Sequence, residues 1–121
     1  MIKGIGIDMC DVEKMRKAVS RTGFAEKVFS EREILYAQGK ANEAEHLAAA
    51  FAAKEALAKA GGWGLAKIGL SSCEVVRCDT GPTFNFSDDL RFLLDERGVK
   101  NVFLSITHES GMAAAVVVME G

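Results

Sequence analysis

The sequence predicts one domain, residues 1–121, in which helices and antiparallel strands share a core. Short apolar segments separated by turn signals are typical of strands. One 18-residue run, 43–60, consists almost entirely of good helix formers. Near the C-terminus, two apolar segments flank the polar sequence His108-Glu109-Ser110-Gly111, as in a β-hairpin. With 121 residues, of which 49% are hydrophobic, the chain can form a core without disulfides or a structural metal.

The N-terminal residues Ile2–Ile7 predict a short strand that ends at Asp8. Gly4 and Gly6 alternate with isoleucines, so another backbone or a ligand could approach this strand closely. The two glycines form half of a dinucleotide-binding fingerprint. However, no third glycine follows, and Asp8 occupies the region where the phosphate-binding helix would begin. A nicotinamide-dependent enzyme is therefore not expected.

Three helices are expected in the first half of the chain, each with a recognisable end signal. They are Val12 to about Arg21, ended by Gly23; Glu31–Gly39, capped by Ser30 with Glu33; and 43–60, capped by Asn42 and stopped by Gly61-Gly62. The third helix would span about 27 Å and cross the whole domain. Its many alanines permit close packing.

The second half of the chain predicts mainly strands. The expected elements are a strand Ile68–Cys78, a turn 79–82, a returning strand Thr83–Phe86, a helix from Ser87 through Arg97, a strand Val102–Thr107, a hairpin loop 108–111 and a strand Met112–Met119. The last of these is a continuous apolar run, which indicates a strand inside the sheet, antiparallel to its predecessor.

Charge and cysteine content exclude several classes of protein. The chain has 15 Lys and Arg against 17 Asp and Glu, a net charge of −2, which argues against general binding to nucleic acids or anionic membranes. No apolar run approaches the roughly 20 residues needed to cross a bilayer. The three cysteines show no CxxC spacing, and no signal peptide opens the chain, so we expect a cytoplasmic protein.

The long helix contains the most informative pattern of charges. Phe51, Glu55 and Lys59 are spaced i, i+4, i+8 and therefore lie in one column. An ordinary surface Glu-Lys pair is the commoner explanation for such spacing. Alanines surround this column nearly all the way round, which predicts instead that the charges are buried and need partners.

Asp8 and Glu55 together would form an oxygen-rich site suited to Mg²⁺, with Lys59 one turn away to meet a phosphate. The spacing alone does not predict that they meet, because 46 residues separate the two carboxylates. His108 lies in the expected hairpin loop, where a solvated turn residue is commoner than a ligand, and Ser105 could add a hydroxyl donor.

A basic stripe marks the first helix of this acidic chain. It consists of Lys14, Arg16, Lys17 and Arg21. Such a stripe is usually a solvated face. It could also steer an acidic protein partner, since complementary charge raises the association rate and fixes orientation.

Three segments in order resemble the holo-acyl-carrier-protein synthases, small phosphopantetheinyl transferases. They are Gly4-Ile5-Gly6-Ile7-Asp8, the segment from Phe51 to Ala60 with sequence FAAKEALAKA, and Leu104-Ser105-Ile106-Thr107-His108-Glu109. The resemblance covers nearly the whole chain. It implies an α+β fold with an antiparallel sheet packed against the long helix, and a homotrimer with active sites between subunits.

The resemblance also implies roles for individual residues. Asp8 and Glu55 would bind Mg²⁺, and Lys59 would contact the phosphates of coenzyme A. Phe51 and Lys54 belong to the same motif and would help to bind coenzyme A, with Ser105 and His108 reaching the cleft from the hairpin. The basic stripe on the first helix would receive the acidic acyl carrier protein.

The implied reaction, part of fatty acid biosynthesis, moves 4′-phosphopantetheine from coenzyme A to a carrier-protein serine and releases adenosine 3′,5′-bisphosphate. Asp8, Glu55 and Lys59 would be the catalytic residues, and the proton acceptor would be either a magnesium-bound hydroxide or Glu55 acting through water. Two alternatives remain open: a non-catalytic module that binds a carrier protein, and a magnesium-dependent phosphohydrolase.

The chain departs from the family pattern in places that bear on nucleotide contact. Ala50 stands where the family commonly has Arg, Gly81 and Pro82 are adjacent where a basic residue usually separates them, and Trp63 lies within the glycine-rich segment that follows the helix. The metal pair is unaffected by these differences.

Overall fold

The computed structural model describes residues 1–121, which form five strands, six α-helices and one short 3-10 helix. In chain order the elements are β1 (Ile2–Asp11), α1 (Val12–Val19), α2 (Phe24–Val28), α3 (Glu31–Gln38), α4 (Glu43–Gly61), α5 (Leu65–Ile68), η1 (Leu70–Ser72), β2 (Cys73–Cys78), β3 (Gly81–Phe86), α6 (Asp88–Glu96), β4 (Asn101–Glu109) and β5 (Met112–Glu120).

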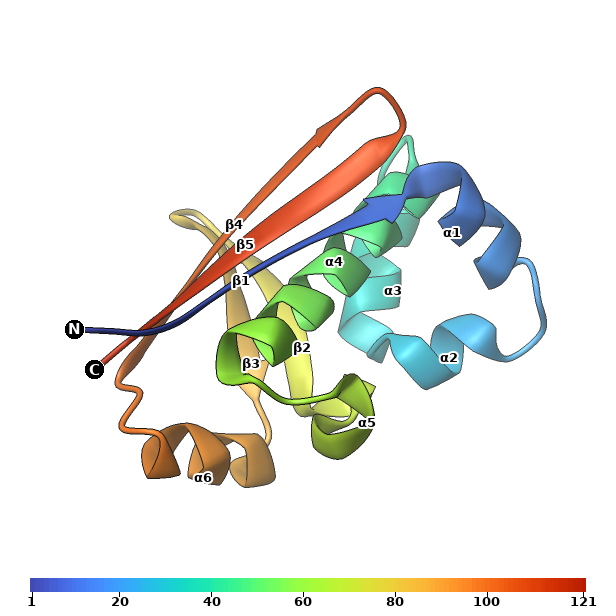
Figure 1. Cartoon of the computed structure of the whole chain (residues 1–121). Helices are drawn as coiled ribbons and strands as arrows, with labels where there is room; N and C mark the ends of the chain where they lie inside the picture. The colour runs from blue at the N-terminus through green and yellow to red at the C-terminus, as the bar shows by residue number, and fades with distance from the viewer.

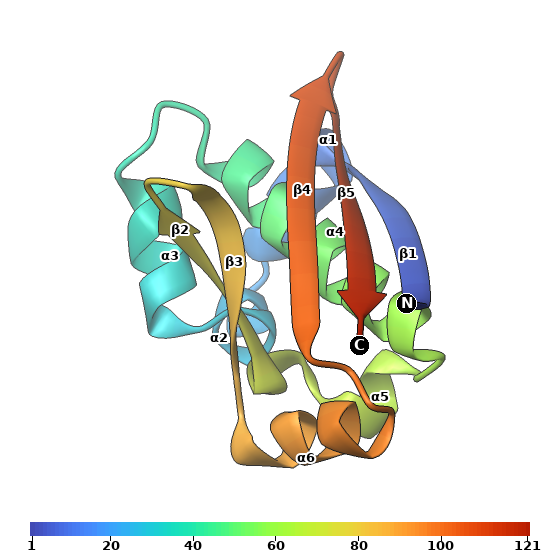
Figure 2. The same ribbon diagram turned by 90° about the vertical axis from the view of Figure 1, so that its left-hand side faces the viewer.

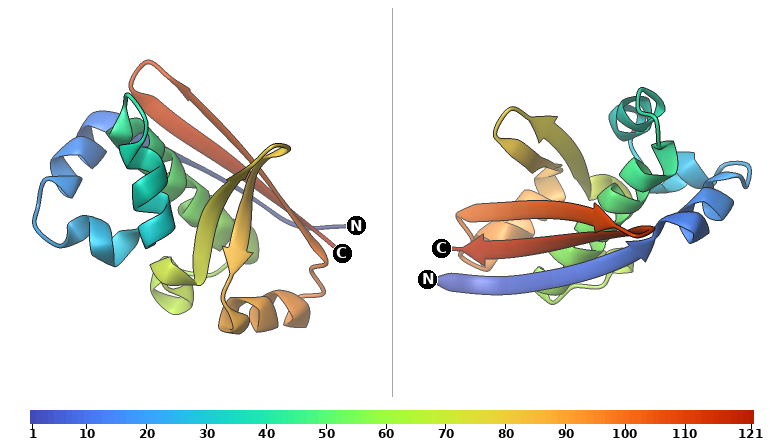
Figure 3. Two further views of the ribbon diagram at one scale, coloured as in Figure 1. Left: turned by 180° about the vertical axis from the view of Figure 1, so that it is seen from behind. Right: turned by 90° about the horizontal axis from the view of Figure 1, so that it is seen from above.

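Two antiparallel sheets lie on either side of α4. The larger sheet has the order β1-β5-β4, so the apolar strand β5 occupies its centre, as predicted. The hairpin β2-β3 forms the smaller sheet beside β4 (Figure 2). The helix α4 runs along one face of the larger sheet (Figures 1 and 3). This arrangement confirms the predicted α+β fold, with an antiparallel sheet packed against the long helix.

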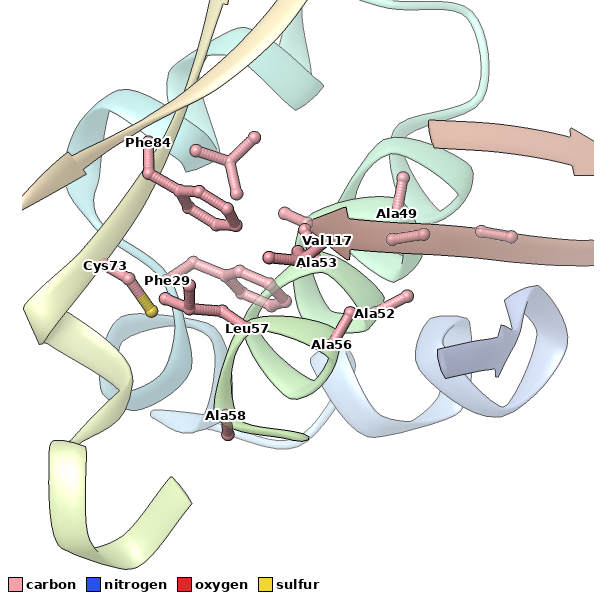
Figure 4. Packing of buried hydrophobic residues seen from close by; sticks show 14 of the residues in the cluster. Phe29, Ala49, Ala52, Ala53, Ala56, Leu57, Ala58, Cys73, Phe84 and Val117 are labelled. Atoms are coloured by element: carbon pink, nitrogen blue, oxygen red, sulfur yellow. The ribbon is translucent and has the colours of Figure 1, made fainter. Parts of the chain in front are cut away.

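The core is centred on α4, in which 13 of 19 residues are buried. Its alanines let both sides of the helix pack closely. Figure 4 shows them between Val117 of β5 on one side and Phe29, Cys73 and Phe84 on the other. A helix that is apolar nearly all round is a central element rather than a surface element.

Local end signals explain where the helices begin. Side-chain oxygens of Ser30, Asn42 and Ser87 accept hydrogen bonds from backbone N–H groups three residues later, at 3.1, 3.2 and 3.2 Å. At Ser30 the capping box is complete, because Glu33 Oε1 accepts from the Ser30 N–H at 2.8 Å. Each cap satisfies a donor that a helix N-terminus leaves free.

Several predicted boundaries were wrong. β1 continues to Asp11, so Asp8 lies within the strand and pairs with Ala115 rather than ending the strand. The first helix ends at Val19, which leaves Arg21 outside it. The two short helices α2 and α5 were not predicted.

The hairpin between β4 and β5 is tighter than predicted. His108 and Glu109 belong to β4 and pair with Ala113 and Met112, so they are not loop residues. The turn consists only of Ser110 and Gly111, with φ of 52° and 78°. Positive φ at both central residues is the conformation that matches the twist of a two-residue hairpin.

The predicted strand Ile68–Cys78 was wrong in its first five residues. Ile68 ends α5, and Leu70–Ser72 form the 3-10 helix η1. Only Cys73–Cys78 is a strand, and it pairs with Gly81–Phe86. No helix in the chain is both long and apolar enough to traverse a membrane.

Candidate active site on β1 and α4

The glycines of β1 place this strand directly on α4. Gly6 is buried, and a Cβ at this position would overlap the carbonyl oxygen of Ala56; a Cβ at Gly4 would overlap that of Ala60. Only glycine permits so close an approach between two backbones. The alternation of a strand puts Asp8 on the same face as Gly4 and Gly6, toward α4. The predicted close approach at the two glycines is therefore confirmed.

This contact brings Asp8 together with the charged column of α4. Lys59 Nζ donates to Asp8 Oδ1 at 2.8 Å and to the carbonyl oxygen of Ile7 at 3.1 Å. The side chain of Lys59 remains 55% exposed, whereas that of Asp8 is only 19% exposed. The structure therefore places a carboxylate at the base of the site and an ammonium at its rim.

Glu55 is the third charged residue at this site, beside Asp8 and Lys59, and its pKa depends on both. Burial and the nearby Asp8 raise the pKa of Glu55 above 4.5, and Lys59 partly offsets this effect. The pKa of Lys59 is raised by its hydrogen bond with Asp8 and by the negative charge there. Besides burial and hydrogen bonding, both shifts reflect the nearness of the Asp8 carboxylate, whose charge a bound cation would offset.

A third titratable group, the Cys10 thiol, lies near the same carboxylates. Burial and the carboxylates of Asp8, Asp11 and Glu55 together raise the pKa of the Cys10 thiol. Cys10 follows Asp8 by two positions and so lies on the same side of β1. Its environment favours the protonated thiol.

The donor set suits a hard divalent cation that keeps part of its water shell. Asp8 and Glu55 offer two carboxylates, and nowhere does the chain gather three or more His, Cys, Asp or Glu side chains that could enclose a metal. Mg²⁺ commonly binds through one or two carboxylates, with waters and substrate phosphates as further ligands. The residues therefore fit a magnesium site that shares its ion with a phosphorylated substrate.

Lys54, expected to contact coenzyme A, is instead buried within the chain. It has 0% exposed side chain, and its Nζ lies 3.1 Å from Glu33 Oε1. The same Nζ donates to the carbonyl oxygens of Leu70 and Cys73 at 2.8 and 2.6 Å. The structure thus does not bring Lys54 together with Lys59 at the surface.

Glu33 is a residue whose second role the sequence did not indicate. The capping box accounts for its Oε1, but its Oε2 accepts a hydrogen bond from the Val75 N–H of β2 at 2.7 Å. No local signal connects residues 33 and 75, because their contact depends on how β2 folds back onto α3.

Ser105 and His108 lie apart from the Asp8 group within one chain. Ser105 is exposed on the outer face of the larger sheet, whereas Asp8 faces α4. His108 lies near the other end of α4, with its Nδ1 3.3 Å from Glu45 Oε2. The ten residues from Glu45 to Glu55 correspond to about 15 Å of helix. Phe51 is half-buried against the core.

The basic residues of the stripe, three of them in α1 and Arg21 just beyond its end, are exposed and differ in their partners. Arg16 pairs with Glu13, and its Nη2 donates to Asn42 Oδ1 at 3.2 Å. The guanidinium of Arg21 lies 5.3 Å from the centre of the Phe24 ring. Lys14, Lys17 and Arg21 have no acidic partner, so they provide the free positive charge of this surface.

The larger cavities do not coincide with the charged group. The largest has a volume of about 530 Å³ and lies between the end of α1 and the start of α4, lined by Arg16, Val19, Ser20 and residues 41–44. The five principal cavities include neither Asp8, Glu55 nor Lys59. Within one chain the candidate site is therefore an open surface rather than an enclosed pocket.

Known proteins resemble this chain in both sequence and fold. The chain matches the 4′-phosphopantetheinyl transferase superfamily over residues 4–117. It is 37% identical to the holo-[acyl-carrier-protein] synthase of Geotalea daltonii, with 99% of both chains covered. It is 41% identical to that of Treponema denticola, with 100% of both chains covered.

Solved structures agree with these relatives. The holo-[acyl-carrier-protein] synthase of Neisseria meningitidis has a TM-score of 0.90 at 31% identity, with 100% of both chains covered. That of Helicobacter pylori, solved in complex with coenzyme A, has a TM-score of 0.83 at 29% identity, covering 96% of this chain and 99% of that one. The chain therefore belongs to the 4′-phosphopantetheinyl transferase superfamily, as a relative of the holo-[acyl-carrier-protein] synthases.

Proposed function

We propose that the protein transfers the 4′-phosphopantetheine arm from coenzyme A to a serine of apo acyl carrier protein and releases adenosine 3′,5′-bisphosphate. The observation that supports this most strongly is the meeting of Asp8, Glu55 and Lys59 at the contact between β1 and α4. Relatives over the full chain are named holo-[acyl-carrier-protein] synthases, and one solved relative contains coenzyme A.

Asp8 and Glu55 are the residues that would hold Mg²⁺ in this reaction. When bound, the ion would neutralise charge on the diphosphate of coenzyme A. The raised pKa of Glu55 is consistent with this assignment, because burial is its main cause and the negative charge of Asp8 adds to it. Lys59, more than half exposed at the rim, is positioned to contact a phosphate while Asp8 limits the directions its Nζ can take.

Phosphoryl transfer depends mainly on alignment and charge neutralisation. We propose that Lys59 offsets the negative charge on the leaving phosphate. The serine hydroxyl of the carrier protein, held in place by docking, attacks in line. The serine proton needs an acceptor near the site. We propose that Glu55 accepts this proton through an intervening water.

The outer face of the larger sheet supports assembly into a homotrimer. Ile5, Ile7 and Met9 of β1 and Phe103 of β4 are 64%, 63%, 59% and 55% exposed. Adjoining apolar side chains with this exposure favour an interface. Ser105 lies on this face, so we propose that a neighbouring subunit's Ser105 and His108 complete each active site. The family resemblance suggests that three subunits assemble.

The surface of α1 is the proposed dock for the acidic carrier protein. Lys14 and Lys17 have no acidic partner, although the chain as a whole is negative. Local positive charge would guide the carrier protein and set its orientation. The free thiols Cys10, Cys73 and Cys78 are consistent with a reaction that takes place in the cytoplasm.

One assay separates this function from its alternatives. The protein is incubated with coenzyme A, Mg²⁺ and an apo acyl carrier protein, and the mass of the intact carrier is then measured by mass spectrometry. Transfer adds the mass of the arm to the carrier serine. A carrier that is bound but never modified would favour a docking module. Release of adenosine bisphosphate without any carrier would favour a phosphohydrolase.

A further inference from the structure

We propose that Lys54 is a positioning residue, whose buried ion pair with Glu33 fixes α4 in the rotation that turns Glu55 toward Asp8. This inference rests on the proposed function, in which Asp8 and Glu55 share a divalent cation. Lys54 precedes Glu55 directly, so whatever holds the side chain of Lys54 also holds the backbone that carries Glu55.

The ion pair has the features of a fixed contact. The side chains of Lys54 and Glu33 are 0% and 2% exposed. Lys54 Nζ has three acceptors, which are Glu33 Oε1 at 3.1 Å, Leu70 O at 2.8 Å and Cys73 O at 2.6 Å. Each of the three N–H bonds of an ammonium therefore has an acceptor inside the chain. No buried side-chain polar atom in the chain lacks a partner.

The pair joins four segments at one point. Glu33 lies in the first turn of α3 and also accepts hydrogen bonds from the N–H groups of Ser30 and Val75, at 2.8 and 2.7 Å. The two carbonyl acceptors of Lys54 belong to η1 and to the first residue of β2. The turn of α4 that contains Lys54 is thereby fixed to α3, η1 and β2 at the same time.

The opposite side of α4 is fixed by β1. Gly6 and Gly4 lie against the carbonyl oxygens of Ala56 and Ala60, within the same two turns of the helix. Successive residues of a helix are about 100° apart, so a rotation of α4 by one residue would turn Glu55 away from β1. The ion pair on one side and the glycine contact on the other together prevent such a rotation.

Space filling alone does not explain a lysine at this position. An apolar pair can replace a buried ion pair at little or no cost in stability. An apolar side chain, however, fills the volume without fixing one atom against three oxygen atoms. The specific consequence of Lys54 is therefore the rotation and axial position of α4, which a methionine of similar length would not set.

The test uses the double variant Lys54→Met/Glu33→Gln, which removes both buried charges and retains an oxygen that can cap α3. Leu90→Ala is the control, because Leu90 is buried in α6 and α6 contributes no residue to the site. Thermal melts first identify a temperature at which all three proteins are folded. Binding of Mn²⁺ as a probe is then followed by electron paramagnetic resonance. Nuclear Overhauser effects between the protons of Gly6 and those of Ala56 and Ala60, here called the Gly6 contacts, are recorded by NMR in metal-free protein.

The double variant is expected to raise the Kd for Mn²⁺ at least tenfold and to weaken the Gly6 contacts. Leu90→Ala is expected to change the Kd less than twofold and to keep those contacts, even if it melts at a lower temperature. A double variant with unchanged Gly6 contacts and unchanged Mn²⁺ affinity would overturn the positioning role. A wild-type protein that binds no Mn²⁺ would refute the proposed metal site, and the Gly6 contacts would then decide the role of Lys54 alone.

Discussion

Lys59 Nζ lies 2.8 Å from Asp8 Oδ1, although 50 residues separate the two along the chain. This ion pair crosses the contact between β1 and α4 and includes the carbonyl oxygen of Ile7 as a second acceptor. A carboxylate that is largely buried therefore has its positive partner before any substrate arrives. Lys59 is consequently oriented toward the site by Asp8.

The variant Lys59→Met tests whether this lysine serves the substrate rather than the metal. Because Lys59 lowers the pKa of Glu55, its removal should raise that pKa further, as followed by a carbon NMR titration. Phosphopantetheine transfer should fall by about 100-fold or more, the usual cost of removing one group that stabilises developing charge. Mn²⁺ affinity should not decrease, because two carboxylates then face the ion without a competing ammonium. A loss of Mn²⁺ affinity in Lys59→Met would contradict the assignment of Lys59 to the substrate and of the two carboxylates to the metal.

Glu55→Gln tests the pH dependence of stability. The folded pKa of Glu55 lies above 4.5, so folded protein holds its proton to higher pH than unfolded protein does. Stability therefore decreases as the pH rises through the interval between 4.5 and the raised pKa. In buffer free of divalent cations, Glu55→Gln should gain stability relative to the wild type between pH 4 and pH 7. The stability of both proteins is measured by urea unfolding at pH 4 and at pH 7. The same difference in stability between the two proteins at both pH values would contradict this prediction.

Gly6→Ala tests the close approach of β1 to α4. The added Cβ would overlap backbone atoms of Ala56 and Ala60, which cannot move aside as a flexible side chain would. We expect a loss of roughly 1–3 kcal/mol in the free energy of unfolding, as for other overpacked cores, together with a loss of transfer activity. Gly64→Ala is the matched control, because a Cβ there meets nothing within 4 Å and φ is −79°. Equal stability of the two variants would refute the contact.

Ile7→Glu tests the proposed subunit interface. Ile7 and Phe92 are both 63% exposed, but Ile7 lies on the outer face of the larger sheet and Phe92 lies on α6. A charge at Ile7 should reduce the mass in solution, measured by light scattering, from that of a trimer to that of a monomer. Phe92→Glu should leave the mass unchanged. An unchanged mass for both variants would place the interface elsewhere.

Thiol labelling tests the burial of the smaller sheet. Burial raises the pKa of Cys73 to about 11, whereas Cys78 is exposed at the other end of β2. Only the thiolate reacts readily with iodoacetamide. At pH 8 Cys78 should be alkylated within minutes and Cys73 only on unfolding, as mapped by peptide mass spectrometry. Fast labelling of Cys73 in folded protein would show that β2 opens readily.

The sequence was sufficient where local chemistry decides the structure. The caps at Ser30, Asn42 and Ser87, the glycine stop after α4 and the central position of β5 all follow from neighbouring residues or from an apolar run. The two glycines of β1 also indicated that another backbone would lie close. These signals act over a few residues, which is the range that a sequence pattern can describe.

Contacts between distant segments could not be predicted in the same way. The segment Leu70–Ser72 was included in the predicted strand because it precedes the alternating residues Cys73 and Val75, but it forms a 3-10 helix whose Leu70 carbonyl oxygen accepts a hydrogen bond from Lys54. The burial of Lys54 likewise depends on Glu33, which is 21 residues away. The meeting of Asp8 and Lys59 was inferred only from the family resemblance, and the fold now supplies its physical cause.

The central position of β5 also determines how the larger sheet can form. β1 is the first of the five strands in the sequence, yet its only strand partner is β5, the last of them. Neither β1 nor β4 pairs with any other strand of this sheet. The larger sheet therefore joins distant parts of the sequence, and a chain that lacks the nine residues of β5 leaves β1 and β4 without a strand partner in this sheet.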